Sequence, residues 1–152
     1  MHKSWSIDYA FGPSCTNEFI FKTFGEPLVD NALIGYNTVL FMYGQTSSGK
    51  TFTLFGGGTV DGLVGYSLEY MFRKVAVSND CEYIIKLSYA ELYNEELKDL
   101  LSENNNNLKI FDDPMLGPVI QGITQEAFTS VESAKSILVS RMLNCSRAYK
   151  IM

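Results

Sequence analysis

The sequence has few of the residues that build metal sites and few basic residues. His2 is its only histidine, and Cys15, Cys81 and Cys145 stand far apart without a Cys-x-x-Cys or Cys/His spacing. A zinc site or a redox motif needs such a spacing, so we expect no structural metal and a reduced environment. The chain has 12 Lys and Arg against 17 Asp and Glu, a formal net charge of −5, and no basic stripe. We therefore expect no nucleic acid partner.

Long apolar runs are also missing. No stretch approaches the roughly 18 consecutive apolar residues of a membrane span. The N-terminus leads into polar and aromatic residues rather than into the apolar stretch of a signal peptide. We expect no membrane partner and an intracellular protein. With 152 residues, 46% of them hydrophobic, the chain can bury one core and should be one domain or part of one.

The most informative segment is Gly44–Thr51, which reads Gly-Gln-Thr-Ser-Ser-Gly-Lys-Thr. It is a complete Gly-x-x-x-x-Gly-Lys-Thr phosphate loop. In such a loop the backbone N–H groups curl around phosphates, the lysine reaches the β and γ phosphates, and the last hydroxyl binds Mg²⁺. Lys50 and Thr51 take those two roles here. The other reading of the pattern, a Gly/Ser-rich turn between a strand and a helix, predicts no ligand.

The context of the loop favours the phosphate site. The apolar run Thr38–Tyr43 before it predicts a short buried strand, and Lys50–Leu54 after it has no early breaker and predicts a helix. The glycines of Phe55–Gly62 predict a mobile surface loop that interrupts this helix. The helix then resumes. Four apolar residues at the helical spacing i, i+3, i+4, i+7 predict its packed face: Leu68, Met71, Phe72 and Val75.

The remaining segments predict strands alternating with helices. Before the phosphate loop we expect a strand at Trp5–Phe11, a Gly-Pro turn, and a helix carrying Ile20, Phe24 and Leu28. After it we expect, in order, a largely buried strand at Cys81–Leu92, a helix at Tyr93–Leu101, a solvated loop at Asn104–Asn107, strands at Leu108–Phe111 and Val119–Phe128, and a turn at Asp112–Gly117 between them. Thr129-x-x-Glu132 predicts a capping box that opens a last helix, with the inward row Ala134, Leu138 and Met142. The fold class is therefore α/β, a P-loop NTPase-type sheet flanked by helices.

Three segments in order resemble the kinesin motor domain. They are Gly35-Tyr36-Asn37, the Tyr43–Leu54 stretch around the phosphate loop, and Glu91-x-Tyr93-Asn94-Glu95 with the Asp99-Leu100-Leu101 that follows. Weaker matches at Ile7–Phe11 and Val119–Thr124 extend the resemblance to nearly the whole chain. It implies a partial kinesin motor domain over residues 1–152, lacking the first strand and truncated before the switch I segment.

The resemblance also implies the site residues and their ligands. ATP with Mg²⁺ would be bound by one continuous stretch, Gly44, Gln45, Thr46, Ser47, Ser48, Gly49, Lys50, Thr51 and Phe52. Within it Thr51 would bind the metal, and Phe52 would lie beside the adenine, although a core aromatic at the start of the helix is an equally good reading. The Glu91–Glu95 segment is a fold marker to which we assign no chemistry. Asp112 after Lys109–Phe111 could be taken for a Walker B aspartate, but Lys109 interrupts the apolar run.

Phosphoryl transfer also needs residues that position the attacking water and sense the γ-phosphate. In kinesins these lie in an Asn-x-x-Ser-Ser-Arg-Ser-His and an Asp-x-x-Gly-Ser-Glu segment, and neither occurs in these 152 residues. We therefore assign no catalytic residue in this chain.

The function implied is the ATP-binding part of a cytoplasmic microtubule motor, with tubulin contacts mainly from missing segments and a homodimer formed through an absent stalk. The alternative is a truncated or degenerate kinesin-like module that binds nucleotide or tubulin without turnover. Another P-loop NTPase, such as a nucleotide kinase, would leave the Tyr-Asn-Glu and Asp-Leu-Leu matches unexplained.

Overall fold

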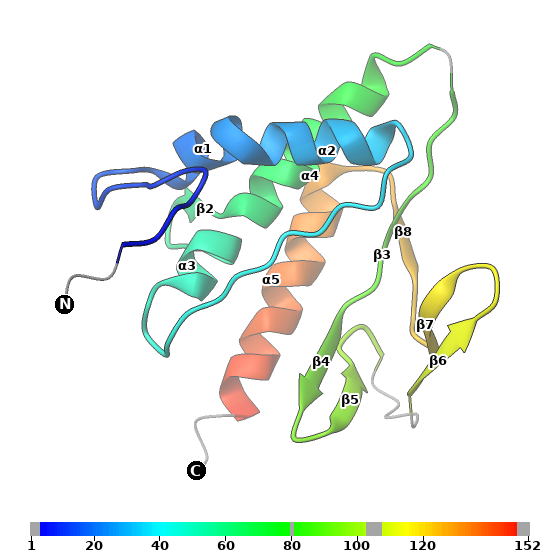
Figure 1. Cartoon of the computed structure of the whole chain (residues 1–152). Coiled ribbons are helices and arrows are strands. Elements are labelled where there is room, and N and C mark those ends of the chain that lie inside the picture. Colours follow the sequence, from blue (N-terminus) through cyan, green and yellow to red (C-terminus); the bar gives the residue numbers. More distant parts are fainter. Residues whose placement is uncertain (1–3, 80, 103–107, 149–152) are drawn as a thin grey trace. The chain divides into compact units, whose positions relative to one another are not determined.

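The computed structural model describes residues 4–79, 81–102 and 108–148, and for residues 142–148 it describes the helical backbone without side chains. The chain divides into two compact units, residues 1–78 and residues 79–152. In Figure 1 the first unit runs from blue to green and the second from green to red. Helices make up most of the regular structure of the first unit, and paired strands with one helix make up that of the second.

The first unit begins with one helical run that joins three elements: α1 (Asn17–Ile20), η1 (Phe21–Gly25) and α2 (Glu26–Leu33). Thr16 caps it, because its hydroxyl oxygen accepts the N–H of Phe19 at 3.2 Å. Ile20 and Phe24 pack against the buried core of the unit. The predicted helix carrying these residues and Leu28 is confirmed.

Within this run η1 is a π-helical turn, and a glycine makes room for an aromatic ring there. A Cβ at Gly25 would lie 2.4 Å from Cδ2 of Phe21, so a larger residue would push the ring away. The Phe21 ring is buried, stacks on Tyr66 at a centroid distance of 5.8 Å, and meets Tyr70 edge-on at 5.9 Å. The core of the unit consists of four buried residues, Phe21, Val29, Leu63 and Tyr70.

The second half of the unit consists of four elements: α3 (Lys50–Phe55), β1 (Gly56–Gly57), β2 (Val60–Asp61) and α4 (Leu63–Ala76). The predicted interruption of the helix is confirmed, and it has the form of a short antiparallel hairpin in which Gly56 faces Asp61. Gly62 is buried where the hairpin closes. A Cβ at Gly62 would lie 2.4 Å from the backbone N of Gly56 and from the backbone O of Leu54. The backbone at Gly62 therefore lies too close to these residues for any side chain.

Helix α4 packs through a face that differs from the predicted one. Its most buried residues are Leu63, 1% exposed, and Tyr70, 7% exposed. The predicted row is half-buried and consists of Leu68, Met71, Phe72 and Val75. Tyr70 also donates its hydroxyl to the carboxylate of Asp30 on α2 at 3.1 Å, which links the two helices and gives the buried phenol a polar partner.

Two predicted strands of this unit, Trp5–Phe11 and Thr38–Tyr43, are not formed as strands. Among the described residues no strand pairs with either segment. Alternation along an extended chain is a local property, whereas a strand needs a neighbour for its N–H and C=O groups. Along Thr38–Tyr43 the side chains nevertheless point alternately towards the core and towards solvent. The inward side chains, Leu40 and Met42, pack against the core, while the outward ones are 78 to 91% exposed, namely Val39, Phe41 and Tyr43.

The strands of the second unit form three antiparallel pairs. They are β3 (Ile85–Leu87) with β8 (Glu126–Phe128), β4 (Ala90–Tyr93) with β5 (Glu96–Asp99), and β6 (Lys109–Asp113) with β7 (Gly117–Gln121). The predicted strand at Cys81–Leu92 is thus shorter and is divided between β3 and β4. The predicted loop at Asn104–Asn107 lies outside the described residues.

The predicted helix at Tyr93–Leu101 is wrong, because this segment is one half of the β4–β5 hairpin. Asn94 and Glu95 form its turn with φ of 49° and 65°, the left-handed conformation that a two-residue hairpin turn requires. Pairing across the turn places Leu92 opposite Leu97 and the carboxylate of Glu91 opposite Lys98.

The strands predicted at Leu108–Phe111 and Val119–Phe128 are present, with the second divided at Gly122, whose φ is 79°. The turn between β6 and β7 is organised by Asp113, whose Oδ1 accepts the N–H groups of Met115 at 2.8 Å and Leu116 at 2.9 Å. These two backbone hydrogen bonds hold the pKa of the Asp113 carboxyl below its usual value. The hydrogen bond from Leu116 has the larger effect on the pKa.

Helix α5 (Val131–Ala148) begins one residue later than its predicted cap implies. The hydroxyl of Ser130, and not that of Thr129, accepts the N–H of Ser133 at 3.3 Å, while the Ser133 hydroxyl donates to the Ser130 carbonyl at 2.8 Å. The predicted inward positions Ala134 and Leu138 are 1% and 7% exposed. The side chain of Met142, the third predicted position, lies outside the described side chains.

Candidate nucleotide-binding site

The candidate phosphate loop joins the extended segment Thr38–Tyr43 to α3. Its two motif glycines have conformations that other residues avoid. Gly49, at the residue before α3, has φ 91° and ψ 5°, and Gly44 has φ 156° with the Ser48 hydroxyl only 2.7 Å from where a Cβ would lie. The loop is therefore shaped by its glycines in the way that the motif predicts.

Lys50 turns its side chain back into this loop. Its Nζ donates hydrogen bonds of 2.7 Å to the carbonyl oxygens of Gly44 and Gln45. An ammonium group held at two carbonyl dipoles on the loop is close to where anionic phosphate oxygens would contact the same backbone. The positive charge of Lys50 therefore lies against the backbone of the loop.

Thr51 and Phe52 lie in the first turn of α3, and both are exposed. The role of Thr51 towards a metal stays a prediction. The Phe52 side chain is 50% exposed and lies against the β1–β2 hairpin, since a Cβ at Gly57 would be 3.4 Å from Cδ2 of Phe52. Phe52 is therefore not a core aromatic, and its contact with adenine stays a prediction.

One supporting residue was missed by the sequence reasoning. Asn17 is 5% exposed, and its Nδ2 donates to the carbonyl oxygens of Phe52 and Asp61, both at 3.1 Å. These hydrogen bonds link α1 to Phe52 of α3 and to Asp61 of the hairpin. No local signal singles out Asn17, since its partners are 35 and 44 residues away in the sequence.

The Asp-Leu-Leu sequence at Asp99–Leu101 has a structural role in the second unit. The Asp99 carboxylate is buried and accepts N–H groups from Leu101 at 2.9 Å and Thr124 at 2.7 Å. Burial alone raises the pKa of this carboxyl, but hydrogen bonds from Thr124, Leu101 and Ser102 outweigh it and lower the pKa. Arg141 of α5 donates to the Leu101 carbonyl at 3.2 Å.

The alternative Walker B aspartate receives no support. Asp112 is exposed in the antiparallel hairpin β6–β7, opposite Pro118, and not at the carboxyl end of a buried strand.

Within the described ranges no three His, Cys, Asp or Glu residues gather in a metal-binding group. In the same part of the chain no helix combines the length and apolar character needed to cross a bilayer.

Comparison with known proteins identifies a family for this chain. A family model described as "Kinesin motor domain" matches residues 1–148. Kinesin-related protein 11 from Dictyostelium discoideum is 38% identical over 138 residues, which cover 89% of this chain and 20% of that protein. The chain therefore spans about one fifth of the length of this curated relative.

Two solved structures are also similar. One is described as the structure of a fast kinesin, with implications for ATPase mechanism and interactions with microtubules. It superposes with a TM-score of 0.87 and 31% identity, and the match covers 93% of this chain and 41% of the other. The second is a kinesin dimer in its two-heads-bound state with AMP-PNP, in complex with a microtubule. Its TM-score is 0.74 and its identity 32%, covering 82% of this chain and 36% of the other. These matches confirm the predicted fold class and the resemblance to the kinesin motor domain.

Proposed function

The chain belongs to the kinesin motor-domain family, and we propose that it is the ATP-binding part of a microtubule motor. In the complete protein, ATP binding and hydrolysis would drive movement along microtubules. The observation that carries the proposal is the phosphate loop, in which the Lys50 ammonium is held at the carbonyls of Gly44 and Gln45 by two 2.7 Å hydrogen bonds.

The proposed site consists of Gly44–Phe52, with each part in a separate role. The backbone from Gly44 to Gly49 wraps the triphosphate of ATP, and Lys50 exchanges its carbonyl partners for oxygens of the β and γ phosphates. The hydroxyl of Thr51 binds Mg²⁺, which neutralises charge on the phosphates. Phe52 contacts the adenine with the exposed part of its ring.

Residues 1–152 form part of a single motor domain in this proposal. The coverage of 41% of a solved kinesin chain supports it. Neither segment that positions water and senses the γ-phosphate in kinesins occurs in these residues, so catalytic residues are assigned to other parts of the complete protein. We place the complete motor in the cytoplasm, on microtubules, as a homodimer joined by a stalk. The neighbour described as a dimer in complex with a microtubule supports this placement.

Replacing Lys50 by alanine in the complete protein tests this function. ATP turnover and microtubule gliding should both be lost, whereas Lys22→Ala, which changes an exposed lysine paired with Glu18 on α1, should leave both unchanged. Gliding that survives Lys50→Ala would remove the proposed site. No geometric observation favours the alternative module without turnover. A complete wild-type protein that binds ATP without hydrolysing it would establish that alternative.

A further inference from the structure

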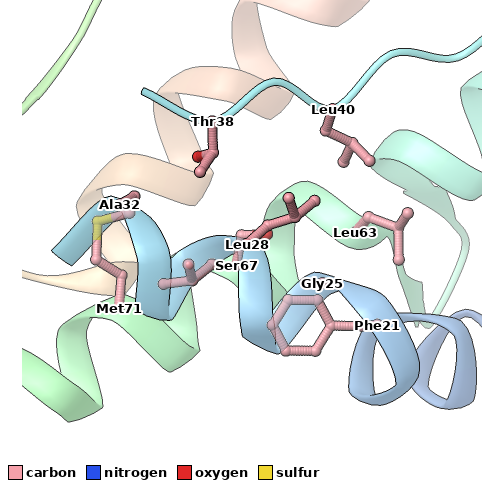
Figure 2. A pocket seen from close by; sticks show the side chains of 10 residues that line it. Phe21, Gly25, Leu28, Ala32, Thr38, Leu40, Leu63, Ser67 and Met71 are labelled. Carbon is pink, nitrogen blue, oxygen red and sulfur yellow. The ribbon is translucent and has the colours of Figure 1, made fainter. Parts of the chain in front are cut away.

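We propose that a cavity in the first unit binds a small aromatic molecule carrying one hydrogen-bond donor, such as phenol or indole. The cavity has a volume of about 180 Å³ and lies between α2, α4 and the extended segment Thr38–Leu40 (Figure 2). All of its walls belong to residues 1–78. It is separate in position from Gly44–Phe52, none of which lines it.

The walls of this cavity are mainly apolar. Leu28 and Ala32 contribute from α2, Leu63 and Met71 from α4, and Leu40 from the extended segment. A cavity of about 150 Å³ with a similar lining of apolar side chains stays dry and binds benzene. The present cavity is somewhat larger, so it has room for an aromatic ring with one polar substituent or for a fused second ring. The flexible side chain of Met71 can adapt to the shape of such a ligand.

Ser67 and Thr38 are the polar side chains among the residues that line the cavity, and Ser67 is the more buried of the two. Figure 2 shows Ser67 on α4 among these lining residues. The Ser67 hydroxyl oxygen can accept a hydrogen bond from a phenolic O–H or an indole N–H. Sites for small molecules commonly have this composition, with apolar walls and a few placed polar groups. Thr38 is exposed at the rim, which gives the cavity an opening.

The position of the cavity distinguishes it from an ordinary packing defect. Protein interiors contain few voids larger than a water molecule. Here one wall is the chain that continues into Gly44, and this chain has no strand partner among the described residues. A ligand against Leu40 would add apolar contacts to those that already hold this segment against the core.

The proposal is tested with the whole chain and with phenol and benzene as probes, by following chemical shifts in NMR titrations without nucleotide. This makes the result independent of the proposed ATP site. Both probes should give saturable shifts of unit 1 residues. Ala32→Leu fills the cavity and should weaken both by at least tenfold, while the matched exposed change Ala76→Leu at the end of α4 should alter neither. Equal binding by these two variants would overturn the proposal.

A second variant keeps the test valid if Ala32→Leu folds poorly. Ser67→Ala removes only the hydroxyl and leaves the apolar walls in place. Loss of one hydrogen bond should weaken phenol binding by about fivefold and leave benzene binding unchanged. No saturable shift with either probe in the folded wild-type chain would overturn the cavity as a ligand site, and an unchanged phenol affinity in Ser67→Ala would overturn the assignment of its polar partner.

Discussion

The Nζ of Lys50 lies 2.7 Å from the carbonyl oxygen of Gly44, so the one basic residue of the phosphate loop is hydrogen-bonded to the first residue of the loop. This hydrogen bond links the end of the motif to its beginning. Because anionic phosphate oxygens are better partners for an ammonium group than neutral carbonyls, this contact can be exchanged when a nucleotide enters.

We expect Lys50→Ala to affect binding and folding very differently. Loss of a charge-assisted contact should weaken ATP binding to the chain by about 10- to 100-fold. The free energy of unfolding should change by no more than about 0.5 kcal/mol, as for other substitutions at solvent-accessible positions. Titration with a fluorescent ATP analogue and urea unfolding measure the two quantities. Lys22→Ala is the matched lysine control, and equal ATP affinity in both variants would contradict the prediction.

Gly62→Ala should destabilise the first unit through a steric clash alone. The backbone of Gly62, with φ −97° and ψ 179°, is open to any residue, but a Cβ would lie 2.4 Å from backbone atoms of Gly56 and Leu54. Such overpacking costs about 1–3 kcal/mol. Gly12→Ala is the control, since nothing lies within 4 Å of a Cβ there. Urea midpoints that coincide for the two variants would show that the hairpin yields without cost.

Asn17→Ala should also lower the stability of this unit. It removes the two hydrogen bonds that the Asn17 amide donates to the carbonyls of Phe52 and Asp61, and a typical hydrogen bond contributes about 0.5–1.5 kcal/mol. Asn31→Ala, at an exposed position of α2, serves as the comparison. Hydrogen exchange of the α3 amides should rise in Asn17→Ala only, and identical exchange in both variants would rule out this role of the amide.

The Asp99 carboxylate should make the stability of the second unit depend on acid pH. Its pKa in the folded chain is below the ordinary value of 3.8, so its contribution is present above about pH 4 and is lost as the pH falls through the lowered pKa. Asp99→Asn should reduce stability at pH 7 by about 1.5–3 kcal/mol. The reduction should shrink towards pH 3. Urea unfolding across this range measures it, with the exposed Asp112→Asn as control. A pH-independent difference would contradict the prediction.

Ser130→Ala and Thr129→Ala together locate the start of α5. The hydroxyl of Ser130 accepts the Ser133 N–H, so its removal should cost about 1 kcal/mol of stability. Thr129→Ala should have little effect because Thr129 is exposed and does not cap the helix. Thermal unfolding of both variants decides the matter. A larger loss in Thr129→Ala would restore the cap that the Thr-x-x-Glu pattern predicts.

The phosphate loop and the helix after it could be predicted from the sequence because their signals are local. Gly44 and Gly49 adopt conformations that suit glycine, and α3 begins at Lys50 as predicted. The roles of individual loop residues towards ATP and Mg²⁺ stay predictions. The β4–β5 hairpin was not predicted, since the predicted helix Tyr93–Leu101 began inside the segment that turns at Asn94 and Glu95 and pairs Tyr93 with Glu96.

The sequence by itself thus determined the phosphate loop, the interruption of the helix behind it and the long helical run before it, all of which depend on residues close together in the chain. The family resemblance also came from the sequence, through motifs that occur in the same order along the chain. The tertiary structure alone decided which extended segments became strands, where Asn17 and Asp99 found their partners, and where a cavity remained. Those outcomes depend on neighbours that are distant in the sequence. Val39, Phe41 and Tyr43 illustrate the difference, because their alternation suits a strand and yet they remain exposed where the described residues provide no partner.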